Sequence, residues 1–263
     1  GWEAGKNAQV DTGTVMIGYR AGIVKTGHSS ISIGYEAALL SRSGGMIAIG
    51  RDAARGVGQH NASGLAIGHQ AGTRIMSGST DSVTLVGYRA GYQMSGSNTF
   101  VGYSSGYGSV SSAPYGSGEH NTALGHNTLY NLSTGHSNVA VGYTAGGAVT
   151  TGGQNVLVGY SAGSSITTGT HNTAIGYQAL DVNVEGDYNT CIGSGAGGGF
   201  NNTGNDHNTC IGYNAGTGGN NQDVDDIVAI GSEALTNIDN NGADGTVAIG
   251  RSALKALTFA TGN

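Results

Sequence analysis

One short motif recurs from end to end of this chain and constrains its fold more than any other feature. A series of fourteen glycines, each directly preceded by Ile, Val or Leu, is spaced at intervals of 15 to 23 residues. Self-similarity at such a period is the signature of a repeat architecture. The glycine of each copy is numbered zero below, and the series is Gly18, Gly34, Gly50, Gly68, Gly87, Gly102, Gly125, Gly142, Gly159, Gly176, Gly193, Gly212, Gly231 and Gly250.

Each copy has the composition of one short β-strand followed by turns. Position −3 is Val, Ile, Leu or Thr, position +1 is most often Tyr, and position +3 is Ala in twelve of the fourteen copies, with Ser105 and Thr128 as exceptions. The remaining positions are rich in Gly, Asn, Ser, Thr and Asp, which favour turns. Glycine makes up about 19% of the chain, against roughly 7% in an average protein, and this density excludes helices. We therefore predict an all-β fold, a parallel β-solenoid of about fourteen coils in which neighbouring coils pair as parallel strands.

The repeat predicts one array over residues 1–263, without an internal domain boundary. Residues 1–5 match the Gly-Tyr-x-Ala-Gly part of the motif, and residues 261–263 match the turn before a further copy. We therefore expect a segment of a longer fibre. The longest interval, between Gly102 and Gly125, predicts a loop insertion over residues 106–121.

The alternation of side chains predicts an oligomer. In a strand, positions −3 and −1 share one face and position −2 lies on the other, and all three are mostly apolar or small. A coil of about 17 residues has a single interior, so the second apolar face requires another chain, and we predict a homotrimer around a central axis. In a single chain the −2 column would then be an exposed apolar stripe. The −1 column is predicted to form the core and the trimer seam: Ile17, Ile33, Ile49, Ile67, Val86, Val101, Leu124, Val141, Val158, Ile175, Ile192, Ile211, Ile230 and Ile249.

The best copies resemble two related families. Asn172-Thr173-Ala174-Ile175-Gly176 and Ile227-Val228-Ala229-Ile230-Gly231 resemble the head repeats of trimeric autotransporter adhesins. The version Thr-Ala-Ile-Gly-Tyr-x-Ala resembles repeats of bacteriophage tail fibres, and the longer, variable coils favour this second family. The resemblance implies a left-handed β-roll, assembled as an intertwined or side-by-side homotrimer that projects from a surface and contacts a host.

Composition argues against several other functions. Charged residues make up 10% of the chain, the formal net charge is −6, and the ten Lys and Arg residues are scattered. We therefore expect no nucleic-acid partner. The chain has no apolar run long enough for a membrane helix, so we expect no membrane insertion. No Gly-x-Ser-x-Gly sequence sits on a strand-to-helix elbow as in hydrolases, and the His-Glu-x-x-His of zinc proteases does not occur, so we expect no enzymatic activity.

A column of aspartates is the first candidate metal site. Asp187, Asp206, Asp225 and Asp244 all lie at position −6 of successive copies. Stacked carboxylates repel one another, and a row of Ca²⁺ ions would relieve that repulsion. The alternative is an Asx turn that opens each strand and faces solvent.

Aromatic residues are the candidate receptor contacts. Tyr107, Pro114 and Tyr115 lie in the long insertion, where a loop on a rigid scaffold suits recognition. The alternative is a tolerated insertion without a binding role. The tyrosines at +1 would form either a carbohydrate-binding strip or simple packing at a corner of the coil.

Histidine and cysteine provide weaker candidates. Histidines that precede strands could bind a metal or a glycan, or could simply bond a turn carbonyl; they are His28, His120, His136, His171 and His207. Cys191 and Cys210 share position −2 in adjacent copies, where we expect free thiols in the core rather than a disulfide.

Taken together, these features predict a structural and adhesive segment of an extracellular trimeric fibre, on a virion or a cell surface, that attaches to a host glycan or protein receptor. Two alternatives remain. One is a purely structural surface filament. The other is a solenoid that binds ice or another crystal surface through threonines at −3, an arrangement that we expect to fail because −3 should face inward.

Overall fold

A computed structural model describes residues 1–9, 13–23, 29–40, 45–56, 63–73, 82–108, 116–200, 204–218, 224–236 and 243–255. Two compact units divide the chain, Gly1–His136 and Ser137–Asn263. Pro114, Tyr115 and His28, which the sequence singled out, lie outside the described residues.

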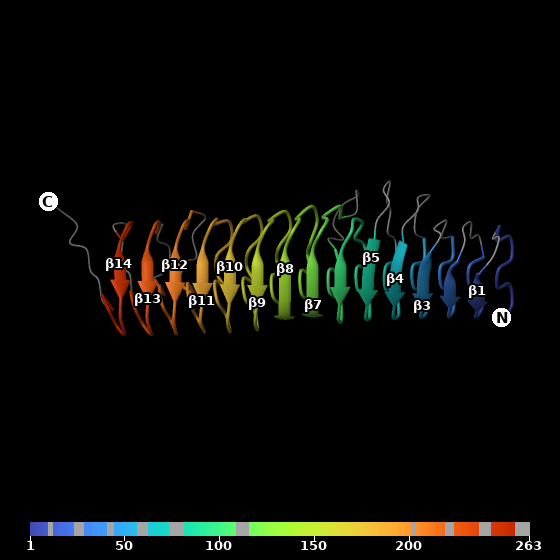
Figure 1. Ribbon diagram of the computed structural model, residues 1–263, viewed down its shortest axis with the longest axis horizontal. Helices are drawn as coiled ribbons and strands as arrows, with labels where there is room; N and C mark the ends of the chain where they lie inside the picture. The colour runs from blue at the N-terminus through green and yellow to red at the C-terminus, as the bar shows by residue number, and fades with distance from the viewer. Residues whose placement is uncertain are drawn as a thin grey trace. The chain divides into compact units, whose positions relative to one another are not determined.

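The first unit contains seven short parallel strands, which lie side by side in chain order (Figure 1). Neighbouring strands pair at equivalent positions of the repeat, so that Met16 lies opposite Ser32 and Phe100 opposite Ala123. The register keeps every residue type of the repeat in its own column. The strands are β1 (Val15–Ile17), β2 (Ile31–Ile33), β3 (Met46–Ile49), β4 (Ser63–Ile67), β5 (Ser82–Val86), β6 (Thr99–Val101) and β7 (Thr122–His126).

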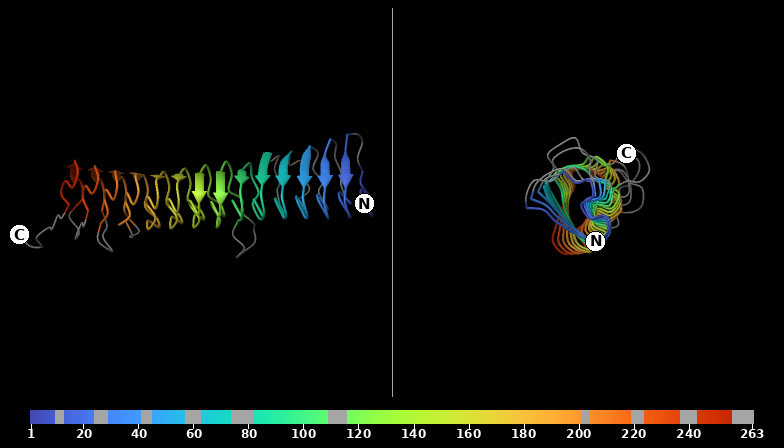
Figure 2. Two further views of the ribbon diagram at one scale, coloured as in Figure 1. Left: turned by 90° about the horizontal axis from the view of Figure 1, so that it is seen from below. Right: turned by 90° about the vertical axis from the view of Figure 1, so that its right-hand side faces the viewer.

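The second unit repeats this arrangement with seven more parallel strands. Its register is equally regular: Ala174 lies between Leu157 of one neighbouring strand and Cys191 of the other. The left view of Figure 2 shows the strands of each unit along the upper edge and the connecting turns of successive coils stacked below them. The strands are β8 (Val139–Tyr143), β9 (Val156–Val158), β10 (Thr173–Ile175), β11 (Thr190–Ile192), β12 (Thr209–Ile211), β13 (Val228–Ile230) and β14 (Val247–Ile249).

The predicted fold class is confirmed. The chain is an all-β parallel β-solenoid, and the described residues contain no helix. One strand occurs in each copy of the repeat, at the three residues before the glycine at position zero. Turns of four to six residues follow each strand, as the abundance of Gly, Asn and Ser predicts.

The glycine at position zero is required for two reasons. Gly176 has a φ of +140°, a region that L side chains rarely adopt. A Cβ atom at Gly176 would also collide with the carbonyl oxygen of Gly193 in the next coil. The backbones of adjacent coils therefore pass so closely at this point that only glycine fits, and the motif marks a tight corner of the coil.

A second corner follows at position +2, where residues other than glycine adopt the left-handed conformation. Arg20 has a φ of 53° and Gln178 a φ of 51°. This conformation costs about 1 to 2 kcal/mol for an L residue. Backbone hydrogen bonds between coils offset the cost: the Gln178 N–H donates to the Tyr160 carbonyl at 2.8 Å.

The interior of each coil is narrow and is filled by positions −2 and +3. The side chains at −2 are almost all fully buried, from the small Ala174 to the large Phe100. The alanines at +3, such as Ala179, are buried beside them. The expectation that a single chain would expose the −2 column was therefore wrong. It is the −1 and −3 columns that face outward, and the expectation that the −3 threonines face inward was wrong for the same reason.

A ladder of buried asparagines at position −4 runs through the interior. Asn172 is fully buried, and its Oδ1 accepts hydrogen bonds from the backbone N–H and the Nδ2 of Asn189, at 3.0 and 3.1 Å. Its Nδ2 donates to the Gly186 carbonyl at 2.8 Å. Each asparagine thus binds two neighbouring coils together without leaving a buried amide unpaired. The ladder comprises Asn98 and Asn121 in the first unit, and Asn138, Asn155, Asn172, Asn189 and Asn208 in the second.

Candidate functional site

The outer face of the sheet in each unit is apolar. At position −1, Ile17 is 55% exposed and Ile249 is 66% exposed, and the other members of this column are exposed or half-buried. Val139 and Val156 of the −3 column are exposed beside them in the second unit. Each unit therefore presents parallel rows of aliphatic side chains to solvent.

The tyrosines at +1 stack on one another. In the second unit the rings of Tyr143, Tyr160 and Tyr177 have centroids 5.0 and 5.3 Å apart and are nearly parallel. All three remain about half exposed. Because the ring faces are turned toward one another, the column presents ring edges and hydroxyl groups to solvent. Sugar stacking requires an aromatic face, so this geometry favours packing within the column.

Tyr107 belongs to a separate aromatic column at position +5. Its ring lies 5.1 Å from that of Tyr92 and 4.9 Å from that of Tyr130, with interplanar angles of 9° and 4°. The Arg89 guanidinium lies 5.4 Å from the Tyr92 ring centroid. Burial raises the pKa of Tyr107, and the positive charge of Arg89 opposes this effect. Tyr107, one of the three predicted receptor contacts, is thus packed in a stack between Tyr92 and Tyr130.

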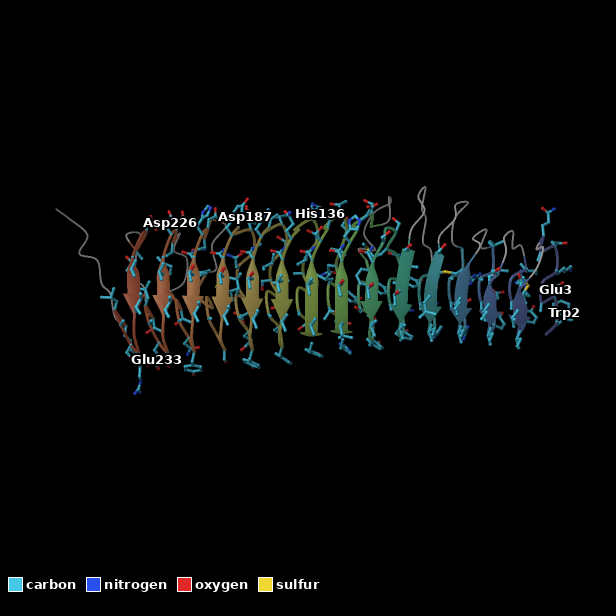
Figure 3. All side chains as sticks on the ribbon, in the orientation of Figure 1. Trp2, Glu3, His136, Asp187, Asp226 and Glu233 are labelled. Carbon is cyan, nitrogen blue, oxygen red and sulfur yellow. The ribbon has the colours of Figure 1, made fainter. Side chains whose placement is uncertain are left out.

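The aspartate column is used for hydrogen bonds between coils. The backbone N–H of Asp187 donates to Asp206 Oδ1 at 2.6 Å, and that of Asp206 donates to Asp225 Oδ1 at 2.8 Å. Asp225 N–H reaches Asp244 Oδ1 in the same way at 3.0 Å. Figure 3 shows Asp187 at the edge where the strands begin and Glu233 at the opposite edge. Each carboxylate therefore has a backbone partner, and among the described residues no three His, Cys, Asp or Glu side chains gather to hold a metal ion.

Two of the predicted histidines join an aromatic stack. His171 and His207 lie on either side of the Tyr188 ring, at centroid distances of 4.5 and 5.1 Å. The His171 Nδ1 also lies 3.1 Å from Thr170 Oγ1. His120 and His136 are exposed in the first unit.

The two cysteines are free and buried, which confirms that part of the prediction. They lie opposite each other in the register of β11 and β12. The hydrogen bond with Cys210 and burial of the group raise the pKa of the Cys191 thiol well above its ordinary value. Both residues therefore serve as small core side chains at position −2.

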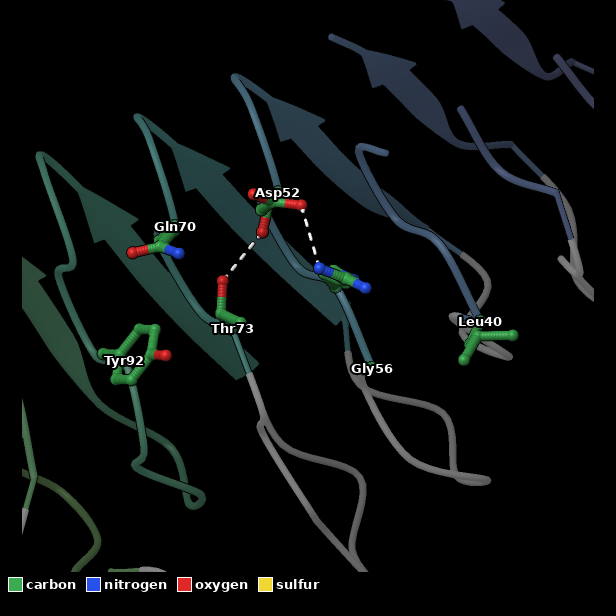
Figure 4. A pocket seen from close by; sticks show the side chains of 7 residues that line it. Leu40, Asp52, Gly56, Gln70, Thr73 and Tyr92 are labelled. Atoms are coloured by element: carbon green, nitrogen blue, oxygen red, sulfur yellow. Dashed lines mark hydrogen bonds and ion pairs between the residues drawn. The ribbon is translucent and has the colours of Figure 1, made fainter. Parts of the chain in front are cut away.

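The first unit contains a pocket of about 330 Å³ that the repeat pattern did not indicate (Figure 4). Its walls come from the corners of four successive coils. Position +2 contributes two residues, position +5 three and position +6 two. They are Asp52 and Gln70, then Arg55, Thr73 and Tyr92, then Leu40 and Gly56.

Charged groups at this pocket are joined in a network of ion pairs, in which Asp52 also faces Arg51 and Glu36 also faces Arg20. The Asp52 side chain is 7% exposed, and its Oδ1 lies 3.3 Å from Arg55 Nη1. The second terminal nitrogen of Arg55 lies 3.3 Å from Glu36 Oε2. Thr73 Oγ1 donates to the Asp52 carbonyl at 2.7 Å, and this hydrogen bond holds the two residues together at the floor of the pocket. The lining is thus polar and hydrogen-bonding, with apolar surface from Leu40 and Tyr92.

A step in side-chain size creates this pocket. At position +5 the fifth coil carries Tyr92, whereas the two preceding coils carry Thr73 and Arg55. The tyrosine stack continues from Tyr92 in the opposite direction, toward Tyr107. The sequence of a single copy does not reveal this difference in side-chain size, because the difference lies between neighbouring copies.

The described part of the chain holds no helix with the length and apolar character needed to span a bilayer. No protein-family model, no curated protein and no solved structure matches this chain.

Proposed function

We propose that this chain is a structural and adhesive segment of an extracellular homotrimeric fibre, of the tail-fibre or adhesin type, carried on a virion or a cell surface. The observation that carries the proposal is the aliphatic outer face of the sheet in each unit. Parallel sheets occur almost only with both faces covered. In these units the coil interior covers one face, and a second and third copy of the chain would cover the other.

The composition of the outer face supports an interface between copies. Contiguous apolar surface larger than a few hundred Å² is rare on monomeric proteins and marks sites of association. Here the aliphatic −1 residues recur in every coil, as in Ile175, Ile192 and Ile211. Closed rotational symmetry would allow each copy to present the same face to the common axis. The number three follows from the resemblance to trimeric fibres.

An adhesive role follows from repetition. Corners and loops that face away from the axis would be displayed many times over on three chains. Weak contacts that act together give strong attachment without any single strong site. Host surface glycans or protein receptors are the proposed partners, and the solenoid would serve as a stiff support.

A second candidate function is binding to ice or another crystal surface. The −3 column faces outward, and it carries threonine in three successive coils of each unit. Such rows on a flat sheet would suit an ordered hydroxyl lattice. The rows are Thr84, Thr99 and Thr122 in the first unit, and Thr173, Thr190 and Thr209 in the second. This candidate requires the outer face to be open, so it excludes the trimer.

The solution mass separates the two. Light scattering on the purified chain should give three times 26.1 kDa if the fibre proposal is right. A monodisperse monomer would overturn the trimer. Thermal hysteresis of that monomer would then support the crystal-surface candidate, and its absence would leave the purely structural filament.

A further inference from the structure

We propose that the pocket lined by Asp52, Gln70, Thr73 and Tyr92 binds a single neutral sugar residue in its pyranose form. This inference deepens the adhesive role proposed above, on which it rests, because it names the ligand class and its site. The first observation is size. At about 330 Å³ the pocket lies at the small end of the range of ligand pockets, about 300 to 1,000 Å³, and therefore suits one small ring.

The charges of the lining select a neutral ligand. Arg55 already faces two carboxylates, those of Asp52 and Glu36, both at 3.3 Å. An anion would meet the Asp52 carboxylate, whereas Arg55 is already paired with carboxylates and Arg89, beside the lining, already donates to Gln70 Oε1. A cation would gain no unpaired carboxylate, because Asp52 also faces Arg51 and Glu36 also faces Arg20. A wholly apolar ligand would remove these charged groups from water without replacing their hydrogen bonds, which is costly.

The hydrogen-bonding groups match sugar hydroxyls, which both donate and accept. The Asp52 carboxylate accepts, and it is held in place by Arg55. Gln70 Oε1 is occupied by Arg89 Nε at 2.7 Å, and this contact orients the Gln70 amide so that its Nε2 can donate. The Thr73 hydroxyl gives its proton to the Asp52 carbonyl, so its oxygen can still accept. Donors and acceptors thus lie on one floor.

The apolar surface completes the match. Tyr92 forms one wall and Leu40 another, as Figure 4 shows. A pyranose ring has an apolar C–H face and a polar rim, so it can pack on the aromatic wall while its hydroxyls reach the floor. Tyr92 is held by its stack on Tyr107, so the wall is preorganised.

The test is titration of the full chain with methyl pyranosides of glucose, galactose, mannose and N-acetylglucosamine, followed by saturation-transfer NMR. Sorbitol, an acyclic polyol with similar hydroxyls, is the control ligand. We expect at least one pyranoside to bind and sorbitol to bind at least tenfold more weakly. No binding by any of the four pyranosides, or equal binding of sorbitol, would overturn the proposal.

Matched variants locate the binding. Tyr92→Leu should lower the affinity for the pyranoside about tenfold, whereas Tyr130→Leu, at the other end of the same stack, should leave that affinity unchanged. Gln70→Ala should weaken binding about fivefold, the worth of one hydrogen bond. Gln178→Ala, which removes the same residue type at the same repeat position of the second unit, should have no effect. Equal losses in a variant and its control would contradict the assigned site, and circular dichroism would verify that all four variants fold.

Failure of the pyranose site is distinguishable from failure of the proposed fibre. A trimeric mass and attachment to host surfaces without pyranoside binding would overturn this inference alone. A monomeric mass would overturn the fibre and leave the pocket to be judged by its own titration.

Discussion

Ser105 Oγ lies 3.0 Å from Thr128 Oγ1, and both side chains are fully buried. These are the two residues that replace alanine at position +3, and they occur in successive coils. Ser105 also donates to the Ala123 carbonyl at 3.1 Å, so the Thr128 hydroxyl must be the donor in the contact between them. The two departures from the repeat therefore satisfy each other.

This pairing predicts a coupled response to mutation. Ser105→Ala should destabilise the protein by about 1 to 3 kcal/mol, because it leaves the buried Thr128 hydroxyl without this acceptor. Adding Thr128→Ala restores the alanine of the other coils, so the double variant should cost less than the sum of the single ones. Urea denaturation measures both. Thr217→Ala, in the other unit, is the control: its loss of unfolding free energy and that of Ser105→Ala should add to within about 0.5 kcal/mol. If the losses caused by Ser105→Ala and Thr128→Ala were also additive, the pairing would be contradicted.

The asparagine ladder predicts that substitution of a single asparagine strongly destabilises the protein. Asn172→Ala removes the acceptor of the Asn189 N–H and the donor to the Gly186 carbonyl. Two buried backbone groups are then unpaired, and we expect a loss of about 3 to 5 kcal/mol in the free energy of unfolding. The exposed Asn131→Ala should change it by less than about 0.5 kcal/mol. Similar effects of the two substitutions would show that the ladder adds little.

The aspartate column predicts stability that does not depend on calcium. Asp206→Ala removes the acceptor of the Asp187 N–H and should cost about 1 to 2 kcal/mol, whereas Asp206→Asn keeps an acceptor and should cost less. A calcium chelator should leave the unfolding midpoint of the wild-type chain unchanged. A fall in the midpoint on chelation, restored by added Ca²⁺, would instead support the cation row.

Glu233 predicts a specific pH dependence. The hydrogen bond and charge of Lys255, whose Nζ lies 2.6 Å from Glu233 Oε2, lower the pKa of the carboxyl from its ordinary 4.5. Since the folded pKa lies below the unfolded one, the stabilisation is present above about pH 4.5 and is lost as the pH falls through the folded value. Lys255→Met should raise the pKa of Glu233 toward 4.5 in an NMR titration. Lys6→Met, in the other unit, should leave the pKa of Glu233 unchanged. If Lys255→Met also left that pKa unchanged, the ion pair with Lys255 would not be the cause of the lowered pKa.

The repeat was sufficient to predict the strands and their register. The glycine at zero fixes a corner, the three residues before it form the strand, and stacking at equal positions follows from the period. The register of Ala174 against Leu157 and Cys191 confirms this. The aspartate column was also visible in the sequence, although its hydrogen bonds to the backbone of the preceding coil were not.

The sidedness of the strand was mispredicted because both faces are apolar. Alternation separates the two faces but does not say which one is inside. Size was a partial signal: position −2 is small in most coils, as in Ala174 and Cys191, although the interior also accommodates Phe100. The recurring asparagine at −4 was also readable, but its burial became evident only from the structure. The pocket depends on the change from Thr73 to Tyr92 between neighbouring coils, which no single copy reveals.

The outward direction of position −1 gives the sharpest test of assembly. Ile192→Glu places a charge on the outer face, where a single chain tolerates it because water is available. In a trimer the same charge would be buried at the seam, so we expect the mass to fall from three chains to one while circular dichroism stays unchanged. Cys191→Asp, one residue earlier, points into the coil and should prevent folding. Ser232→Glu, at an exposed +1 position, is the control and should alter neither mass nor fold. If Ile192→Glu kept the mass of the wild-type assembly, the outer face would not be the seam.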